Sequence, residues 1–114
     1  MSARATQGGS ERPRRPPFLD ELCRRLVRQG AQRIHLFGSW ARGEADEDSD
    51  VDLVVIQETR LPFFDRMRRA AACVEPDWPA DILVYTSAEF EAMRERGNAL
   101  AALVLEEGVL LYGQ

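Results

Sequence analysis

Two spacings of apolar residues alternate along the first half of the chain and divide it into a helix and two strands. Between residues 18 and 29 apolar side chains recur at helical spacing, with Pro17 favouring a helix start and Gly30 a stop. Residues 33–37 and 51–57 are short runs that predict strands, and the second is rich in β-branched side chains, which is typical of a buried strand. The first half is therefore predicted to form a helix followed by two strands.

The second half begins with a further helix and a strand. Pro62 fits the opening turn of a helix, because its missing amide hydrogen is not needed there. Its predicted apolar stripe consists of Phe64, Met67, Ala71 and Val74. Pro76 and Pro79 are predicted to end this helix, and the apolar run at residues 81–85 predicts the third strand.

Capping signals mark the last elements. Residues 86–89 read Thr-Ser-Ala-Glu, a capping box that predicts a helix start, and Gly97 breaks that helix. Asn98 is suited to cap the next helix, which Gly108 stops. Residues 109–112 are predicted to form a short final strand. The order of elements predicts an α/β (α+β) fold, with one small mixed sheet flanked by helices and a site along one sheet edge.

The 114 residues divide into a tail and one domain. Residues 1–17 are rich in Gly, Ser, Arg and Pro without apolar periodicity, so they are predicted to be a disordered N-terminal tail. Residues 18–114 are predicted to form a single domain, too small to hold a separate acceptor-binding domain. We therefore expect a reaction partner to bring its own binding surface.

Gly38 and Ser39 lie where the first predicted strand turns into a short helix. Ser39 is suited to cap that helix, and the absence of a side chain at Gly38 lets a phosphate approach the backbone. Free amides at a helix N-terminus attract anions. These two residues are a candidate phosphate cradle, although Gly-Ser before a helix is also a common turn.

Asp50 and Asp52 flank the start of the second strand. Strand alternation places both carboxylates on one face, where they could share divalent cations and act on a phosphoryl group. Carboxylates combined with substrate phosphates favour Mg²⁺. The alternative is a solvated acidic turn, and we accept that interpretation for the acidic residues between 44 and 48.

The order Gly38-Ser39, ten residues, then Asp50-Val51-Asp52 resembles the polymerase-β-like nucleotidyltransferases, and the surrounding residues are similar to the minimal nucleotidyltransferases of prokaryotes. The resemblance implies the polymerase-β-like fold and a third acidic residue on a neighbouring strand, for which Asp81 fits. It also implies that the three aspartates bind Mg²⁺ and that Asp81 helps to deprotonate the acceptor. Arg42 is a candidate contact to phosphate.

The resemblance further implies a reaction and a partner. Minimal nucleotidyltransferases are often antitoxins that transfer AMP from ATP to a tyrosine of a HEPN-domain ribonuclease toxin. Two alternatives remain: an antitoxin that binds nucleotide or sequesters its partner without catalysis, and nucleotidyl transfer to a small molecule. Larger relatives that modify small molecules carry a helical C-terminal domain, which this sequence lacks.

Charge and hydropathy narrow the partners. Residues 1–17 hold four arginines and one glutamate, whereas the rest of the chain holds 11 arginines and 18 acidic residues. An acidic domain argues against nucleic-acid binding. No lysine is present, which excludes a lysine nucleophile. No apolar run approaches the length of a membrane span, so we expect a cytoplasmic protein. The sequence leaves homo-oligomerisation open.

Overall fold

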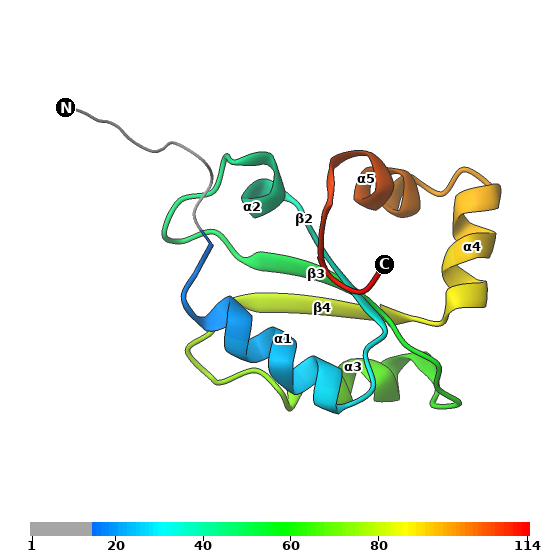
Figure 1. The fold of residues 1–114 in the computed structure, drawn as a ribbon, viewed down its shortest axis with the longest axis horizontal. Coiled ribbons are helices and arrows are strands. Elements are labelled where there is room, and N and C mark those ends of the chain that lie inside the picture. Colours follow the sequence, from blue (N-terminus) through cyan, green and yellow to red (C-terminus); the bar gives the residue numbers. More distant parts are fainter. Residues whose placement is uncertain (1–14) are drawn as a thin grey trace.

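The computed structural model describes residues 15–114 (Figure 1). The predicted disordered tail therefore lies mostly outside the described residues. The elements, in chain order, are α1 (Phe18–Arg28), β2 (Arg33–Phe37), α2 (Ser39–Arg42), β3 (Val51–Ile56), α3 (Phe63–Ala71), β4 (Ala80–Tyr85), α4 (Ser87–Glu95), α5 (Ala99–Glu107) and β5 (Val109–Tyr112). The predicted order of helices and strands is confirmed.

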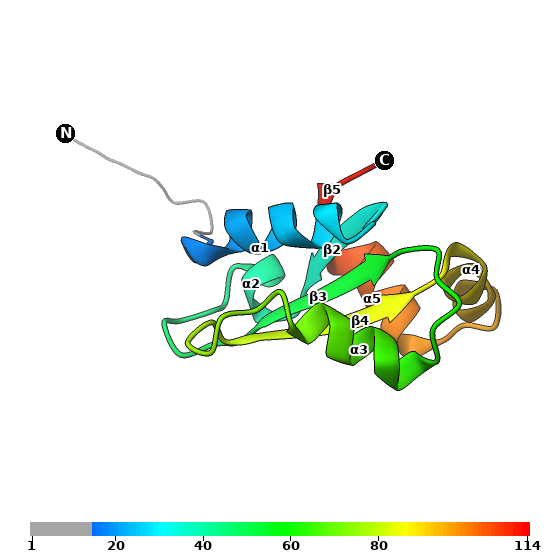
Figure 2. The same cartoon turned by 90° about the horizontal axis from the view of Figure 1, so that it is seen from below.

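The four strands form one mixed sheet in the order β4-β3-β2-β5. β3 and β4 are parallel, while β2 runs antiparallel to both β3 and β5. Helices α1 and α3 cover one face of the sheet, and α4 and α5 cover the other (Figures 1 and 2). This is the helix-flanked mixed sheet that the sequence predicts.

The central strand β3 supplies both halves of the core. Val51, Leu53 and Val55 are fully buried against the side of the sheet that carries α1 and α3. Val54 and Ile56 are fully buried against α4 and α5. Because side chains alternate along a strand, Asp52 belongs to the α4 and α5 face. It lies at the start of the strand and is half-buried.

The predicted caps of α4 and α5 are confirmed. The hydroxyl of Thr86 accepts a bond from the Glu89 amide at 3.1 Å, and the Glu89 carboxylate accepts one from the Thr86 amide at 2.9 Å. The Asn98 side chain accepts bonds from the amides of Leu100 and Ala101 at 2.9 and 3.1 Å. These bonds satisfy amides that a helix leaves without partners, so the two helix starts are fixed locally.

Two predictions about helix ends are wrong. Gly38, not Ser39, is the N-cap of α2, and no side chain caps that helix. The helix α3 ends at Ala71 instead of continuing through Val74, because the following residues form tight turns, in which the Val74 amide donates to the Ala71 carbonyl at 3.0 Å. Val74 still packs against the core cluster under α1 and α3.

Candidate functional site

Asp52 and Asp81 are neighbours across the parallel strands β3 and β4. They occupy the same position in the register between the two strands, so both side chains leave the same face of the sheet. The amide of Val51 donates to the Pro79 carbonyl at 2.8 Å and aligns the two strand starts. Asp50 is exposed and directly precedes β3. The sheet thus brings two of the predicted carboxylates side by side, with the third at the same end of β3.

The environment of Asp52 opposes its ionisation. Burial raises the pKa of the Asp52 carboxyl, and the negative charges of Asp81 and Asp50 raise it further. The Arg42 guanidinium acts in the opposite direction and lowers this pKa. The Asp52 carboxylate is therefore held beside like charges in a half-buried position, which is an arrangement that often marks a functional site.

Gly38 lies against Asp52. The preceding residue, Phe37, pairs with Asp52 in the antiparallel ladder between β2 and β3. Gly38 then turns the chain with φ 78° and ψ −156°, in a region that favours glycine. A Cβ placed on Gly38 would overlap the Oδ2 atom of Asp52 and lie 3.3 Å from its Cγ atom. The position therefore has no space for a side chain while Asp52 keeps its place.

The first turn of α2 leaves backbone donors next to this glycine. The amides of Ala41 and Arg42 donate to the Gly38 carbonyl at 3.0 and 3.1 Å. The amides of Ser39 and Trp40, the first two residues of the helix, have no acceptor within it. Gly38 and Ser39 stay candidate phosphate-binding residues, next to the start of β3 that carries Asp52.

Arg42 is held by carboxylates at the end of α2. Its Nε atom donates to Glu44 at 2.9 Å, and its Nη1 atom lies 3.7 Å from Glu107 on α5. The hydrogen bond from Arg42 to Glu44 is the main reason that the pKa of its guanidinium is raised. A phosphate bound by Arg42 would have to compete with these two acids, so its predicted role stays a proposal.

Trp40 ties the cradle to the acidic loop, a role that the sequence did not reveal. Its indole Nε1 donates to the carbonyl of Ser49 at 3.0 Å, directly before Asp50. Ser49 is itself fixed by Asp46, whose amide donates to the Ser49 hydroxyl at 3.0 Å. A half-buried indole usually finds an acceptor for its N–H, and that rule was the available signal.

The carboxylates suit a hard cation that arrives with its substrate. In the range 15–114, no three His, Cys, Asp or Glu side chains lie close enough to hold a metal ion by themselves. Mg²⁺ commonly takes only one or two protein carboxylates and completes its shell with phosphates and water. The pair Asp52 and Asp81, with Asp50 nearby, fits that mode of binding.

Asp81 also borders an open hollow of about 390 Å³ between α3 and β4. Its lining includes Met67 and Val74 from the α3 side and Trp78 from the loop before β4. Glu75 and Asp81 are the charged residues of its lining, and the other lining residues are of apolar types. The hollow lies on the α1 and α3 face of the sheet, whereas the Asp81 side chain leaves the opposite face together with that of Asp52, so the hollow is not part of the candidate site.

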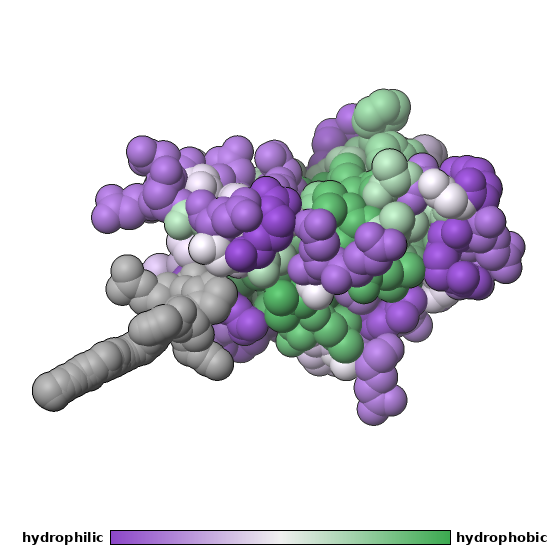
Figure 3. All heavy atoms as spheres, turned by 90° about the horizontal axis from the view of Figure 1, so that it is seen from above, coloured by the Kyte–Doolittle hydropathy of each residue, from purple (hydrophilic) through white to green (hydrophobic). Residues whose placement is uncertain are grey.

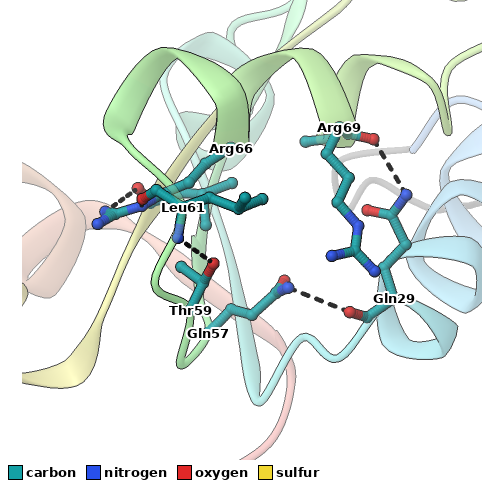
Figure 4. A pocket seen from close by; sticks show the side chains of 8 residues that line it. Gln29, Gln57, Thr59, Leu61, Arg66 and Arg69 are labelled. Atoms are coloured by element: carbon teal, nitrogen blue, oxygen red, sulfur yellow. Dashed lines mark hydrogen bonds between the residues drawn. The ribbon is translucent and has the colours of Figure 1, made fainter.

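A second hollow, at the opposite end of β3, is no comparable site. Its volume is about 10 Å³, which is the space of one water molecule. Gln57 donates to the Gln29 carbonyl at 3.1 Å, and Gln29 donates to the Arg69 carbonyl at 3.0 Å (Figure 4). Arg66 donates to the Leu61 carbonyl at 2.8 Å. These bonds join the ends of α1 and β3 to α3.

Comparison with known proteins decides the family. Residues 18–112 match the nucleotidyltransferase domain family. The chain belongs to this family. No curated protein matches this nucleotidyltransferase-domain chain. Within residues 15–114, no helix is both long and apolar enough to cross a membrane.

Solved structures with similar folds support the assignment of the fold. A protein from Sulfolobus solfataricus assigned as a nucleotidyltransferase has a TM-score of 0.61 and 20% identity, covering 85% of this chain and 78% of that one. A toxin-antitoxin structure with AMP-PNP has a TM-score of 0.57 and 22% identity, covering 83% and 73%. A mutant of the toxin-antitoxin MntA-HpeT has a TM-score of 0.55 and 21% identity, covering 84% and 72%. The chain therefore has the nucleotidyltransferase fold.

Proposed function

We propose that this nucleotidyltransferase-domain protein transfers AMP from ATP to a hydroxyl of a protein partner and acts as the antitoxin of a toxin-antitoxin pair. The observation that carries the proposal is the register pair Asp52 and Asp81, set beside the side-chain-free turn at Gly38. Two of the similar structures are described as toxin-antitoxins, and one of them contains AMP-PNP. The resemblance of the sequence to minimal nucleotidyltransferases adds a tyrosine of a HEPN-domain toxin as the acceptor.

The proposed reaction is an in-line displacement at the α-phosphorus of ATP. The acceptor oxygen forms a bond to this phosphorus, the bond to the bridging oxygen breaks, and pyrophosphate leaves. Asp81 accepts the proton of the acceptor hydroxyl, while the Ser39 and Trp40 amides of α2 hold phosphate oxygens. Mg²⁺ held by Asp50, Asp52 and Asp81 would neutralise the charge of the triphosphate.

Asp81 is exposed on the edge strand β4, where a hydroxyl of a partner protein can reach it. An acceptor that belongs to a partner protein brings its own binding surface. A tyrosine presented by a partner therefore suits this arrangement.

Label transfer tests the proposal. The purified protein is incubated with Mg²⁺, ATP labelled at the α-phosphate and the protein encoded by the neighbouring gene. Label is expected on that partner, and ATP labelled at the γ-phosphate is expected to leave it unlabelled. The double variant Asp50→Asn with Asp52→Asn removes both charges at nearly constant volume and is expected to abolish transfer.

The outcome also separates transfer from sequestration. Mass spectrometry of the partner after co-expression is expected to show the added mass of one AMP. An unmodified partner in a tight complex would contradict transfer and favour a non-catalytic antitoxin. Full label transfer by the double variant would exclude the roles assigned to Asp50 and Asp52.

A further inference from the structure

The helix α5 is apolar on every side, although the sheet covers only one side of it. Its first seven residues, Ala99 to Leu105, are all apolar. Only Ala101 and Val104 are buried against the sheet, whereas Leu105 is 48% exposed. A helix that is apolar all round is normally buried all round. The outer side of α5 is thus an apolar surface without a partner among the described residues.

The strand β5 extends this surface to the edge of the sheet. Leu110 and Tyr112 are 44% and 43% exposed. Figure 3 shows apolar surface over α5 and β5, between the polar surfaces of α2 and α4. We call Leu105, Leu110 and Tyr112, with the outer side of α5, the α5–β5 patch. A contiguous apolar patch of this kind marks an interaction surface.

The edge of β5 lacks most of the features that prevent an edge strand from pairing with a strand of another molecule. β5 stands last in the strand order, and its four residues include no charged residue and no proline. Its one irregularity is a register shift opposite Ile34 and His35. An edge of this composition favours pairing with another strand.

The charges at the two ends of β5 have opposite sign. Glu106 and Glu107 end α5, and only Gly108 separates them from the strand. Arg33 lies at the other end, since a Cβ on Gly113 would come within 2.7 Å of its Cγ atom. Within residues 15–114, neither Arg33 nor Glu106 forms an ion pair. Glu107 forms one long ion pair, with Arg42 at 3.7 Å. The surface therefore has one acidic and one basic end, each with charge available to a partner.

We propose that the α5–β5 patch binds a second copy of this chain, with the two β5 strands antiparallel across a two-fold axis. Such an axis places the acidic end of one copy against the basic end of the other, so the surface is complementary to itself. A parallel arrangement would bring like charges together. The pairing covers Leu110 and Tyr112 and joins the two sheets into one.

The candidate carboxylates Asp52 and Asp81 lie away from this interface. Asp81 lies on β4, which is the opposite edge strand, and Asp52 lies on β3 beside it. The dimer therefore does not depend on the proposed function, and its test needs no nucleotide and no toxin.

Sedimentation velocity over about 1 to 200 µM tests the dimer. The wild-type protein is expected to shift from monomer to dimer across this range. Leu110→Arg is expected to stay a monomer. The control Phe64→Arg places the same charge on α3, at a side chain that is 73% exposed on the other face of the sheet, and is expected to dimerise normally. Circular dichroism confirms that each variant is folded.

A charge swap separates a true interface from damage to the fold. Arg33→Glu and Glu106→Arg are each expected to raise the dimer dissociation constant about tenfold, because each places like charges together. The double variant restores opposite charges and is expected to recover most of the affinity. A wild-type monomer at every concentration, dimerisation of Leu110→Arg, or a double variant weaker than both single ones would each overturn the proposal.

Discussion

The backbone of Gly38 lies against the carboxylate of Asp52, so that a methyl group at Gly38 would overlap the Oδ2 atom of that aspartate. The contact joins the end of β2 to the start of β3, at the point where Phe37 and Asp52 pair. The candidate phosphate-binding turn at Gly38 is therefore in direct contact with the candidate metal ligand Asp52.

Gly38→Ala is expected to lower stability by about 1–3 kcal/mol and to displace Asp52, because a side chain is strained at this φ and collides with the carboxylate. The matched control is Gly97→Ala, which has a similar φ of 73° but no atom within 4 Å of the added methyl group. Gly97→Ala is expected to lose about 1 kcal/mol and keep full AMP transfer. Urea denaturation and label transfer measure both effects, and equal transfer by the two variants would contradict the role of Gly38.

Asp52→Asn is expected to lower AMP transfer by at least about 100-fold while raising stability at neutral pH. The folded protein raises the pKa of Asp52 above its ordinary value, so the folded state binds this proton more tightly than the unfolded state. The charged form therefore destabilises the fold as the pH rises through the folded pKa. Urea denaturation at pH 7 and pH 4 tests the sign, since the gain from Asp52→Asn should shrink at pH 4.

Trp40→Phe is expected to lower stability by about 1 kcal/mol, because the Ser49 carbonyl loses its donor. AMP transfer is expected to fall as well, since the loop before Asp50 loses its tie to α2. The control Asn98→Ala removes the cap of α5 and is expected to cost about as much stability without reducing transfer. Equal transfer by both variants would show that Trp40 contributes to folding alone.

His35 is expected to make the fold sensitive to mild acid. Burial and the nearby Arg33 lower its pKa, and its Nε2 atom has no hydrogen-bond partner within the described residues. As the pH falls, the unfolded state therefore takes up a proton on His35 before the folded state does. The free energy of unfolding decreases as the pH falls from the pKa of His35 in the unfolded state to its lower pKa in the folded state. Urea midpoints from pH 7 to pH 5 are expected to fall less for His35→Phe than for the wild type. Parallel midpoints would contradict this role.

Local chemistry explains why some elements could be predicted from the sequence. Thr86 and Asn98 cap their helices through bonds that span only two or three residues, so the pattern alone identifies them. Ser39 does not cap α2, because the helix begins at Ser39 itself and Gly38 is the N-cap. Asp52 on the neighbouring strand leaves no space for a side chain at residue 38, so that position requires glycine. That constraint depends on pairing between β2 and β3, which local spacing does not contain.

The site shows the same division. The alternation of Asp50 and Asp52 can be seen in the sequence, but the placing of Asp52 beside Asp81 depends on the parallel pairing of β3 with β4. Asp81 was predicted through the resemblance to a family. The bond from Trp40 to Ser49 was missed, because nothing in the sequence says which carbonyl a distant indole will meet.

Asp52 stands at the start of a strand whose later residues hold the two halves of the core together. The chain can therefore lose the carboxylate and keep its architecture. The proposed catalysis and the fold thus depend on different residues of this strand. Under the proposed function, a lineage that needed only to hold its partner could lose the chemistry by a single substitution at Asp52 and gain stability.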